Sequence, residues 1–249
     1  MRALPALWPP EHLGVPRALS EADIGELHLL PDSSNYVFLA ELTHAELGPG
    51  LAVYKPGRGE RPLYDFPDGT LHHREVAAFE FSRLLGWGLV PPTVERDGEH
   101  GLGSLQLFVE HDPGLHYFVL RERTALRPQL VRMAAFDLAA NNADRKAGHV
   151  LLGADERLWA IDNALCFHRD GKLRTVIWDF AGEQVDAEAL RDLERVRRQL
   201  LAGSPEAEAL AGRLTAAERE ALAERLGEFI AQPVLPEVFP WRCWPWPLI

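Results

Sequence analysis

Two short stretches in the middle of the chain decide how the fold is predicted: ADRKAGHV at residues 143–150 and WAIDN at residues 159–163. In the first, Asp144 lies in a polar turn that follows a predicted helix. In the second, Asp162 follows a short apolar strand, eighteen positions after Asp144. Carboxylates at such places can accept a proton from a nucleophile or bind a hard metal ion. The pair therefore indicates a site with one carboxylate for each task.

Two residues of opposite charge precede this pair. Lys55 ends a predicted strand over residues 51–54, and Glu75 lies on a predicted helix over residues 71–85. Alone, each is better explained as a solvent-exposed charge. A strand lysine, a helix glutamate, a catalytic aspartate and a metal aspartate occur in this order in protein kinases. The order predicts that Glu75 pairs with Lys55 and that Lys55 binds nucleotide phosphates.

Composition and charge exclude several other classes of protein. The chain has 249 residues and a net charge of −11, with no block of basic residues. Binding to nucleic acid or to an anionic membrane through a basic face is therefore not expected. No apolar run has the length of a membrane span. Cys166 and Cys243 are far apart, which predicts free thiols and a cytoplasmic location.

The pattern of apolar residues predicts an α+β, two-lobed architecture. Strands are expected at residues 26–30, 36–42 and 51–54, a helix at 71–85, and a hairpin at 93–110 that turns at 97–98. Helices are expected at 129–140 and through 187–232, with short strands at 150–152 and 158–161. Thr215 and Glu218 form a capping-box pattern. We therefore expect a sheet-rich N-terminal lobe (1–110) and a helical C-terminal lobe (111–249).

Five motifs together resemble one known family: SSNYV at 33–37, AVYKP at 52–56, REVA at 74–77, DR at 144–145 and IDN at 161–163. The chain resembles the phosphatidylinositol 3-/4-kinase-like branch of the protein-kinase superfold, in a small bacterial form. The resemblance spans about residues 26–170 and leaves out the helical tail. It implies an ATP-dependent kinase that binds ATP between its lobes.

The resemblance implies a role for each motif. Asp144 would orient or deprotonate the acceptor hydroxyl, beside Arg145 and Lys146, and Lys146 would neutralise charge on the transferred phosphoryl group. Asp162 would bind Mg²⁺. The remaining nucleotide contacts would come from a phosphate turn and from a hinge to the adenine: Ser33, Ser34 and Asn35, and Gln106, Phe108 and Val109.

His149 departs from the family pattern, which has an asparagine five residues after the catalytic aspartate. Imidazole is a poor ligand for Mg²⁺ and suits Mn²⁺ better. His149 would donate a hydrogen bond to phosphate, bind a different metal ion, leave a single-metal site, or stabilise an inactive site. A nucleotide-binding pseudokinase and an AMP transferase of the same fold therefore remain alternatives to a kinase.

Three further points stay open in the sequence. The segment 168–183 mixes basic and acidic residues, so we expect the acceptor to be a protein or a small soluble molecule instead of a lipid. His72, His73 and Glu75 form a second possible set of metal ligands, although Glu75 already has a role. The Trp- and Pro-rich segment 239–247 would pack on its own domain or dock on a partner.

Overall fold

The computed structural model describes residues 7–30, 36–238 and 242–249. The chain forms two compact units, Met1–Val76 with Pro91–Glu110 and Ala77–Val90 with His111–Ile249. The class is mixed α+β, as predicted, with the large sheet in the first unit and most helices in the second. The units differ from the predicted lobes in residues 77–90, which belong to the second unit.

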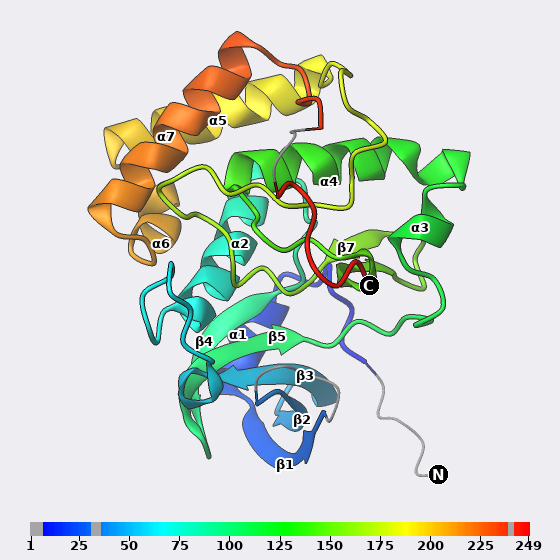
Figure 1. Cartoon of the computed structure of the whole chain (residues 1–249). Coiled ribbons are helices and arrows are strands. Elements are labelled where there is room, and N and C mark those ends of the chain that lie inside the picture. The colour runs from blue at the N-terminus through cyan, green and yellow to red at the C-terminus, as the bar shows by residue number, and fades with distance from the viewer. Residues whose placement is uncertain (1–6, 31–35, 239–241) are drawn as a thin grey trace. The chain divides into compact units, whose positions relative to one another are not determined.

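The first unit is built on a five-stranded antiparallel sheet in the order β1-β2-β3-β5-β4 (Figure 1). Its strands are β1 (Asp23–Leu29), β2 (Phe38–His44), β3 (Gly48–Pro56), β4 (Thr93–Gly98) and β5 (Gly101–Leu107). The hairpin between β4 and β5 pairs Gly98 with Gly101, so its turn lies at residues 99–100, two positions later than predicted. Gly101 has a φ of 93°, which a glycine adopts without strain.

One short helix of the first unit was not predicted. Helix α1 (Val15–Glu21) buries Val15 and Leu19 in a core cluster with residues of the sheet. The guanidinium of Arg96 on β4 donates hydrogen bonds to the carbonyls of Leu19 and Ala22 at the C-terminal end of α1. Those carbonyls have no partner within the helix, so a residue more than seventy positions away satisfies them.

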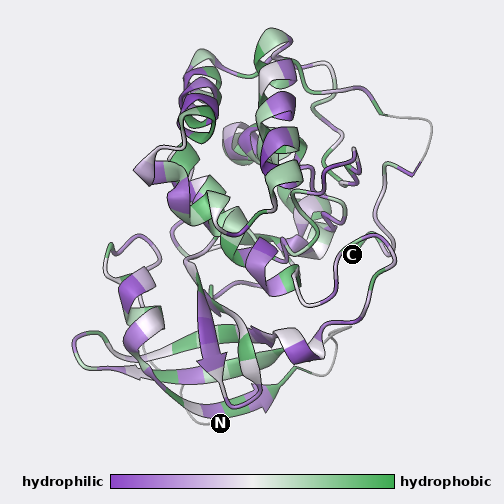
Figure 2. Ribbon diagram, turned by 90° about the vertical axis from the view of Figure 1, so that its left-hand side faces the viewer, coloured by the Kyte–Doolittle hydropathy of each residue, from purple (hydrophilic) through white to green (hydrophobic). Residues whose placement is uncertain are grey.

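The second unit is mainly helical. It contains α3 (Tyr117–Leu120), α4 (Arg127–Ala140), α5 (Ala187–Ala202), α6 (Glu208–Ala211), α7 (Ala216–Ala231) and the hairpin β6 (Val150–Leu152) with β7 (Leu158–Ala160). Its helices mix hydrophilic and hydrophobic residues along their length (Figure 2), with the hydrophobic ones contributing to the core. The predicted capping box is present: Thr215 and Glu218 begin α7.

Helix α2 (Leu71–Leu85) crosses the boundary between the units, which falls after Val76. In its second half, Phe81 contacts Phe136 and Phe167, with ring centroids 5.6 and 5.7 Å apart. Arg195 on α5 donates to the carbonyls of Leu84 and Leu85 at the end of the helix. These contacts explain why residues 77–90 belong to the helical unit.

The structure bears on the expectations about the two cysteines and about membrane-spanning helices. Cys166 and Cys243 are buried thiols that form no disulfide bond, as expected from their spacing. Within the described residues, no helix combines the length and the apolar character needed to cross a membrane.

Gly103 provides a test of the sheet that carries Lys55. It lies opposite Pro56 in the β3–β5 ladder, and a Cβ at this position would be 2.4 Å from the carbonyl oxygen of Lys55. Because that atom belongs to the backbone, the strands would have to separate. We expect Gly103→Ala to lower the free energy of unfolding by about 1–3 kcal/mol in urea denaturation.

Gly171→Ala is the matched control, because a Cβ added there would have no atom within 4 Å and its φ is not in the left-handed region. It should change the free energy of unfolding by less than about 0.5 kcal/mol. Equal effects of the two substitutions would contradict this account of the β3–β5 packing.

Candidate functional site

In the first unit, Lys55 on β3 contacts Glu75 on α2 through Nζ and Oε1. The side chain of Glu75 is 2% exposed and that of Lys55 is 22% exposed. A buried carboxylate is costly without a cation, so each residue holds the other in place. The contact that the sequence predicted is therefore present.

The residues of the first unit that were predicted to contact the nucleotide differ in whether the structure describes them and in what they contact. Ser33, Ser34 and Asn35 lie outside the described residues. Gln106 is buried in β5, where its Nε2 donates to Oγ1 of Thr93. Phe108 follows the strand, and its N–H donates to the carbonyl of Leu51. Val109 is also buried. The side chain of Gln106 is thus engaged inside the sheet.

The second unit is organised around Arg145, which is fully buried. Its Nε and Nη2 donate to the carboxylate of Asp137 on α4 at 3.0–3.1 Å. Nη1 donates to the carbonyl of Ile161, and Nη2 also to Oδ1 of Asn163. Arg145 cannot touch a substrate from this position. We therefore revise its expected place among the catalytic groups: it positions the loops that carry Asp144 and Asp162.

Asp144 lies in the loop that Arg145 holds. Its N–H donates to Oδ1 of Asn142, and its Oδ2 lies 3.2 Å from Nζ of Lys146. Burial raises the pKa of Asp144 to about 6, although the nearby charges of Lys146 and Arg174 lower it. A carboxylate with this pKa is a stronger base than an ordinary aspartate and is still ionised at neutral pH.

His149 and Asp162 are brought together, with Nε2 of the histidine 3.2 Å from Oδ2 of the aspartate. The N–H of Lys146 donates to Nδ1 of His149 at 3.3 Å. Since Nδ1 accepts a hydrogen bond, the proton of the neutral ring is on Nε2, which faces Asp162. This geometry favours a hydrogen-bond donor at position 149 over a metal ligand.

Asp162 has a left-handed backbone with φ of 55°, and its side chain is 46% exposed. The N–H of the preceding residue, Ile161, donates to the carbonyl of His149 at 3.0 Å. The loop at 159–163 is thus joined to the loop at 144–149 through backbone and side chains. An exposed carboxylate oxygen on a fixed loop is a suitable ligand for Mg²⁺.

Asp137 is a residue of the site that was not predicted from the sequence. The available signal was a carboxylate within the apolar second half of a helix, between Phe136 and Leu138. Asp137 is fully buried and also accepts from Asn142 and Thr175. Charged residues are almost never fully buried unless they are paired, so this position pointed to a cationic partner.

The described part of the C-terminal segment, residues 242–249, packs on its own unit, the first of the two alternatives from the sequence. The carbonyl of Leu248 accepts from the N–H of Ala147, next to Lys146 in the Asp144 loop. The carbonyl of Cys243 accepts from the N–H of Thr175 and from Nε1 of Trp178. This segment therefore contributes to the order of the loop.

Comparisons with known proteins give a relative and a fold. No family model matches the sequence. Protein Rv2133c of Mycobacterium tuberculosis is 40% identical over 262 residues, which cover 92% of this chain and 93% of the relative.

Two solved structures are similar to this one. Hydra Fam20, solved with sugar, has a TM-score of 0.55 at 17% identity and matches over 86% of this chain and 85% of its own. The Helicobacter pylori proinflammatory kinase CtkA has a TM-score of 0.54 at 12% identity, over 87% and 94%. At these identities the likeness shows the fold, which is protein-kinase-like.

The buried network predicts a large effect of removing Arg145. Arg145→Ala leaves the carboxylate of Asp137 buried without its cation, so we expect a loss of about 3–5 kcal/mol in the free energy of unfolding. Arg121→Ala is the control, since its ion pair with Asp179 is partly exposed and should contribute no more than about 1 kcal/mol. Chemical denaturation measures both, and a loss of less than about 1 kcal/mol for Arg145→Ala would contradict the central place of this pair.

Proposed function

The chain belongs to the family of Protein Rv2133c and has a protein-kinase-like fold, and we propose that it is an ATP-dependent phosphotransferase of the phosphatidylinositol 3-/4-kinase-like type. One observation carries the proposal. The four charged groups expected of a kinase occur in kinase order, and each is held by specific contacts within its own unit. Lys55 is paired with Glu75, and the loops of Asp144 and Asp162 are joined through Arg145.

In this proposal the residues divide the work of phosphoryl transfer. Lys55 binds the α- and β-phosphates of ATP, and Glu75 positions Lys55. Asp144 accepts the proton of the acceptor hydroxyl, whose oxygen bonds to the γ-phosphorus as the bond to the β–γ bridging oxygen breaks and ADP leaves. Lys146 stabilises negative charge nearby. The second carboxylate, Asp162, would hold a Mg²⁺ ion, which neutralises charge on the phosphates when bound.

In this proposal His149 gives no reason to prefer Mn²⁺ to Mg²⁺. Its Nε2–H faces Oδ2 of Asp162, so the ring offers a proton to the carboxylate and no lone pair to a metal. With the imidazole nitrogen unable to ligate, the ion would be bound by oxygen atoms, which Mg²⁺ prefers as ligands. His149 would act by orienting Asp162.

The acceptor we propose is a hydroxyl of a protein or of a small soluble molecule. The strongly acidic net charge of −11 disfavours attraction to an anionic membrane surface, where a lipid acceptor would lie.

The first prediction from this proposal concerns nucleotide binding. ATP with Mg²⁺ should raise the thermal midpoint of the wild-type protein, because a ligand that binds only the folded state stabilises it. Asp162→Ala should lose the metal-dependent part of the rise and reduce the rate of ADP formation at least about 100-fold, since the metal no longer neutralises the phosphates.

Asp170→Ala is the matched control, because it removes an exposed carboxylate elsewhere in the same unit. It should keep both the thermal rise and the turnover. ATP labelled on the α- or the γ-phosphate then separates AMP transfer from phosphate transfer. No shift with any combination of nucleotide and metal would contradict both the kinase and the pseudokinase hypotheses.

The raised pKa of Asp144 predicts a pH dependence. A general base acts in its deprotonated form, so kcat/KM for ATP turnover should fall as the pH drops below about 6, the pKa of Asp144 in the free protein. Lys146 lowers this pKa, so Lys146→Ala should move the acidic limb to higher pH. A rate profile of both proteins, with Lys172→Ala as the control that leaves the limb in place, measures the effect. An unchanged limb in Lys146→Ala would contradict the role of Asp144 as the base.

A further inference from the structure

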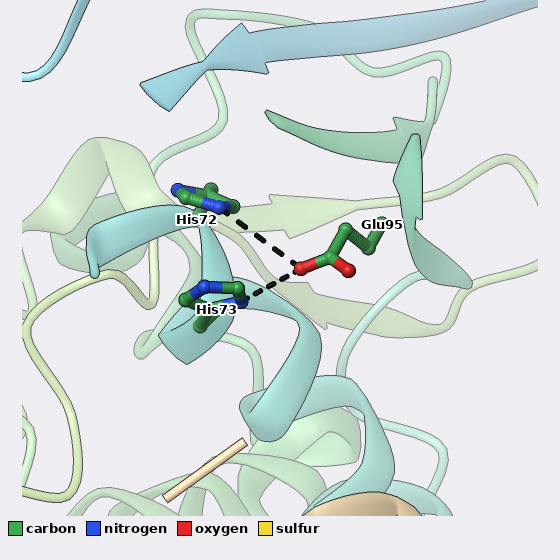
Figure 3. Close-up of side chains that lie close together, drawn as sticks. All are labelled: His72, His73 and Glu95. Atoms are coloured by element: carbon green, nitrogen blue, oxygen red, sulfur yellow. Dashed lines mark ion pairs between the residues drawn. The ribbon is translucent and has the colours of Figure 1, made fainter. Parts of the chain in front are cut away.

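Three side chains of types that can ligate a metal ion meet in the first unit. His72 and His73 begin helix α2, and both rings face Glu95 on β4 (Figure 3). Nδ1 of His73 lies 2.7 Å from Oε2 of Glu95, and Nε2 of His72 lies 4.0 Å from the same oxygen. The three ligand atoms lie within 4.8 Å of one another. Glu95 replaces the Glu75 considered from the sequence, because Glu75 pairs with Lys55.

His72 has the tautomer that metal binding requires. Its Nδ1 lies 2.8 Å from Oε1 of Glu60. The N–H groups of His72 and Leu71 also donate to Oε1 and Oε2 of Glu60, at 2.9 and 3.1 Å. Both oxygens of Glu60 thus accept hydrogen bonds, so the proton of the neutral His72 ring is on Nδ1, which faces Glu60. The lone pair of Nε2 then points toward Glu95.

Nε2 of His72 is also shielded from solvent and makes no hydrogen bond to any described residue. The residue is 6% exposed, and its ring packs so closely on Gly57 that a Cβ there would be 3.0 Å away. A buried polar atom without a hydrogen bond is costly, and a metal ion would satisfy it. A histidine that ligates a metal ion through one ring nitrogen usually donates the N–H of its other ring nitrogen to a carboxylate.

We propose that His72, His73 and Glu95 bind a divalent transition-metal ion of the zinc class. Two imidazole nitrogens and one carboxylate oxygen form a donor set that zinc uses in proteins, with water as the fourth ligand. In a tetrahedral site the ligand atoms are about 3.4 Å apart, which follows from metal–ligand distances of about 2.0–2.2 Å. The separations of 2.7 and 4.0 Å bracket that value, so small side-chain movements admit the ion. Nitrogen donors disfavour Mg²⁺ and thereby separate this site from Asp162.

A metal ion at this site would join the first turn of α2 to the sheet beside Lys55. Glu95 lies opposite Ser104 in the β4–β5 ladder, and Ser104 lies opposite Lys55 in the β3–β5 ladder, so the three share one face of the sheet. Glu75 follows His72 by one turn of α2. The ion would thus stabilise the position of Glu75 against Lys55; only this consequence rests on the proposed function.

The test is direct measurement of metal binding to the full chain in excess Mg²⁺, which occupies carboxylate-only sites. Zn²⁺ competed against a chromophoric chelator should bind with one equivalent per chain, and Co²⁺ should give visible absorption bands of a tetrahedral complex. His73→Ala and Glu95→Gln should abolish binding of the one equivalent of Zn²⁺ and the Co²⁺ absorption bands. Both residues are half-buried, so we expect these variants to fold. Glu60→Gln keeps an oxygen for the helix N–H groups and should weaken binding about 10–100-fold.

His28→Ala is the matched control. His28 belongs to an exposed cluster with Glu26 and Glu41, which also has a potential ligand set. This variant should bind Zn²⁺ like the wild type. Circular dichroism and the thermal midpoint in a chelator confirm that each variant is folded. The proposal is overturned if the wild type binds no Zn²⁺, or if His73→Ala and Glu95→Gln bind it unchanged; either result would leave the cluster as an ion pair without a metal.

Discussion

The buried ion pair between Arg145 and Asp137 is the interaction on which the second unit depends. Taking two charges out of water is expensive, and the cost is recovered only when their remaining donors and acceptors are satisfied. The structure does this through the carbonyl of Ile161 and the amide of Asn163, which lie in the loop of Asp162. The requirement to satisfy one guanidinium thereby determines the course of both carboxylate loops, and α4 supplies the rigid base from which Asp137 reaches them.

The sequence allowed most of the regular elements to be predicted, and the differences have physical causes. The apolar pattern and Gly86 define α2 at residues 71–85, with the same bounds in the structure. Helix α1, in contrast, has only seven residues, too few for a stable helix by itself. Its stability comes from Arg96, which is distant in the sequence. A local pattern cannot contain that contact.

The same distinction applies to the candidate site. The order of Lys55, Glu75, Asp144 and Asp162 could be recognised in the sequence because each residue lies on or next to a helix or strand that the apolar pattern predicts. The burial and the contact partners of each group could not be predicted from the sequence. Arg145 is buried because Asp137 on α4 pairs with it. His73 faces Glu95 because the first turn of α2 lies beside β4. Residue type and order predict the chemistry of a site, whereas burial and tautomer follow from tertiary contacts.

His149 has a structural part in these contacts. Asp162 has a left-handed backbone, which is uncommon for residues other than glycine and must be held by its surroundings. His149 provides two such constraints, because its carbonyl accepts from Ile161 and its ring faces the Asp162 carboxylate. The two carboxylate loops are therefore linked to each other by contacts within the protein. An ion that arrives with its nucleotide would meet a ligand already in position, so its affinity would depend on charge and little on the entropy of ordering a loop.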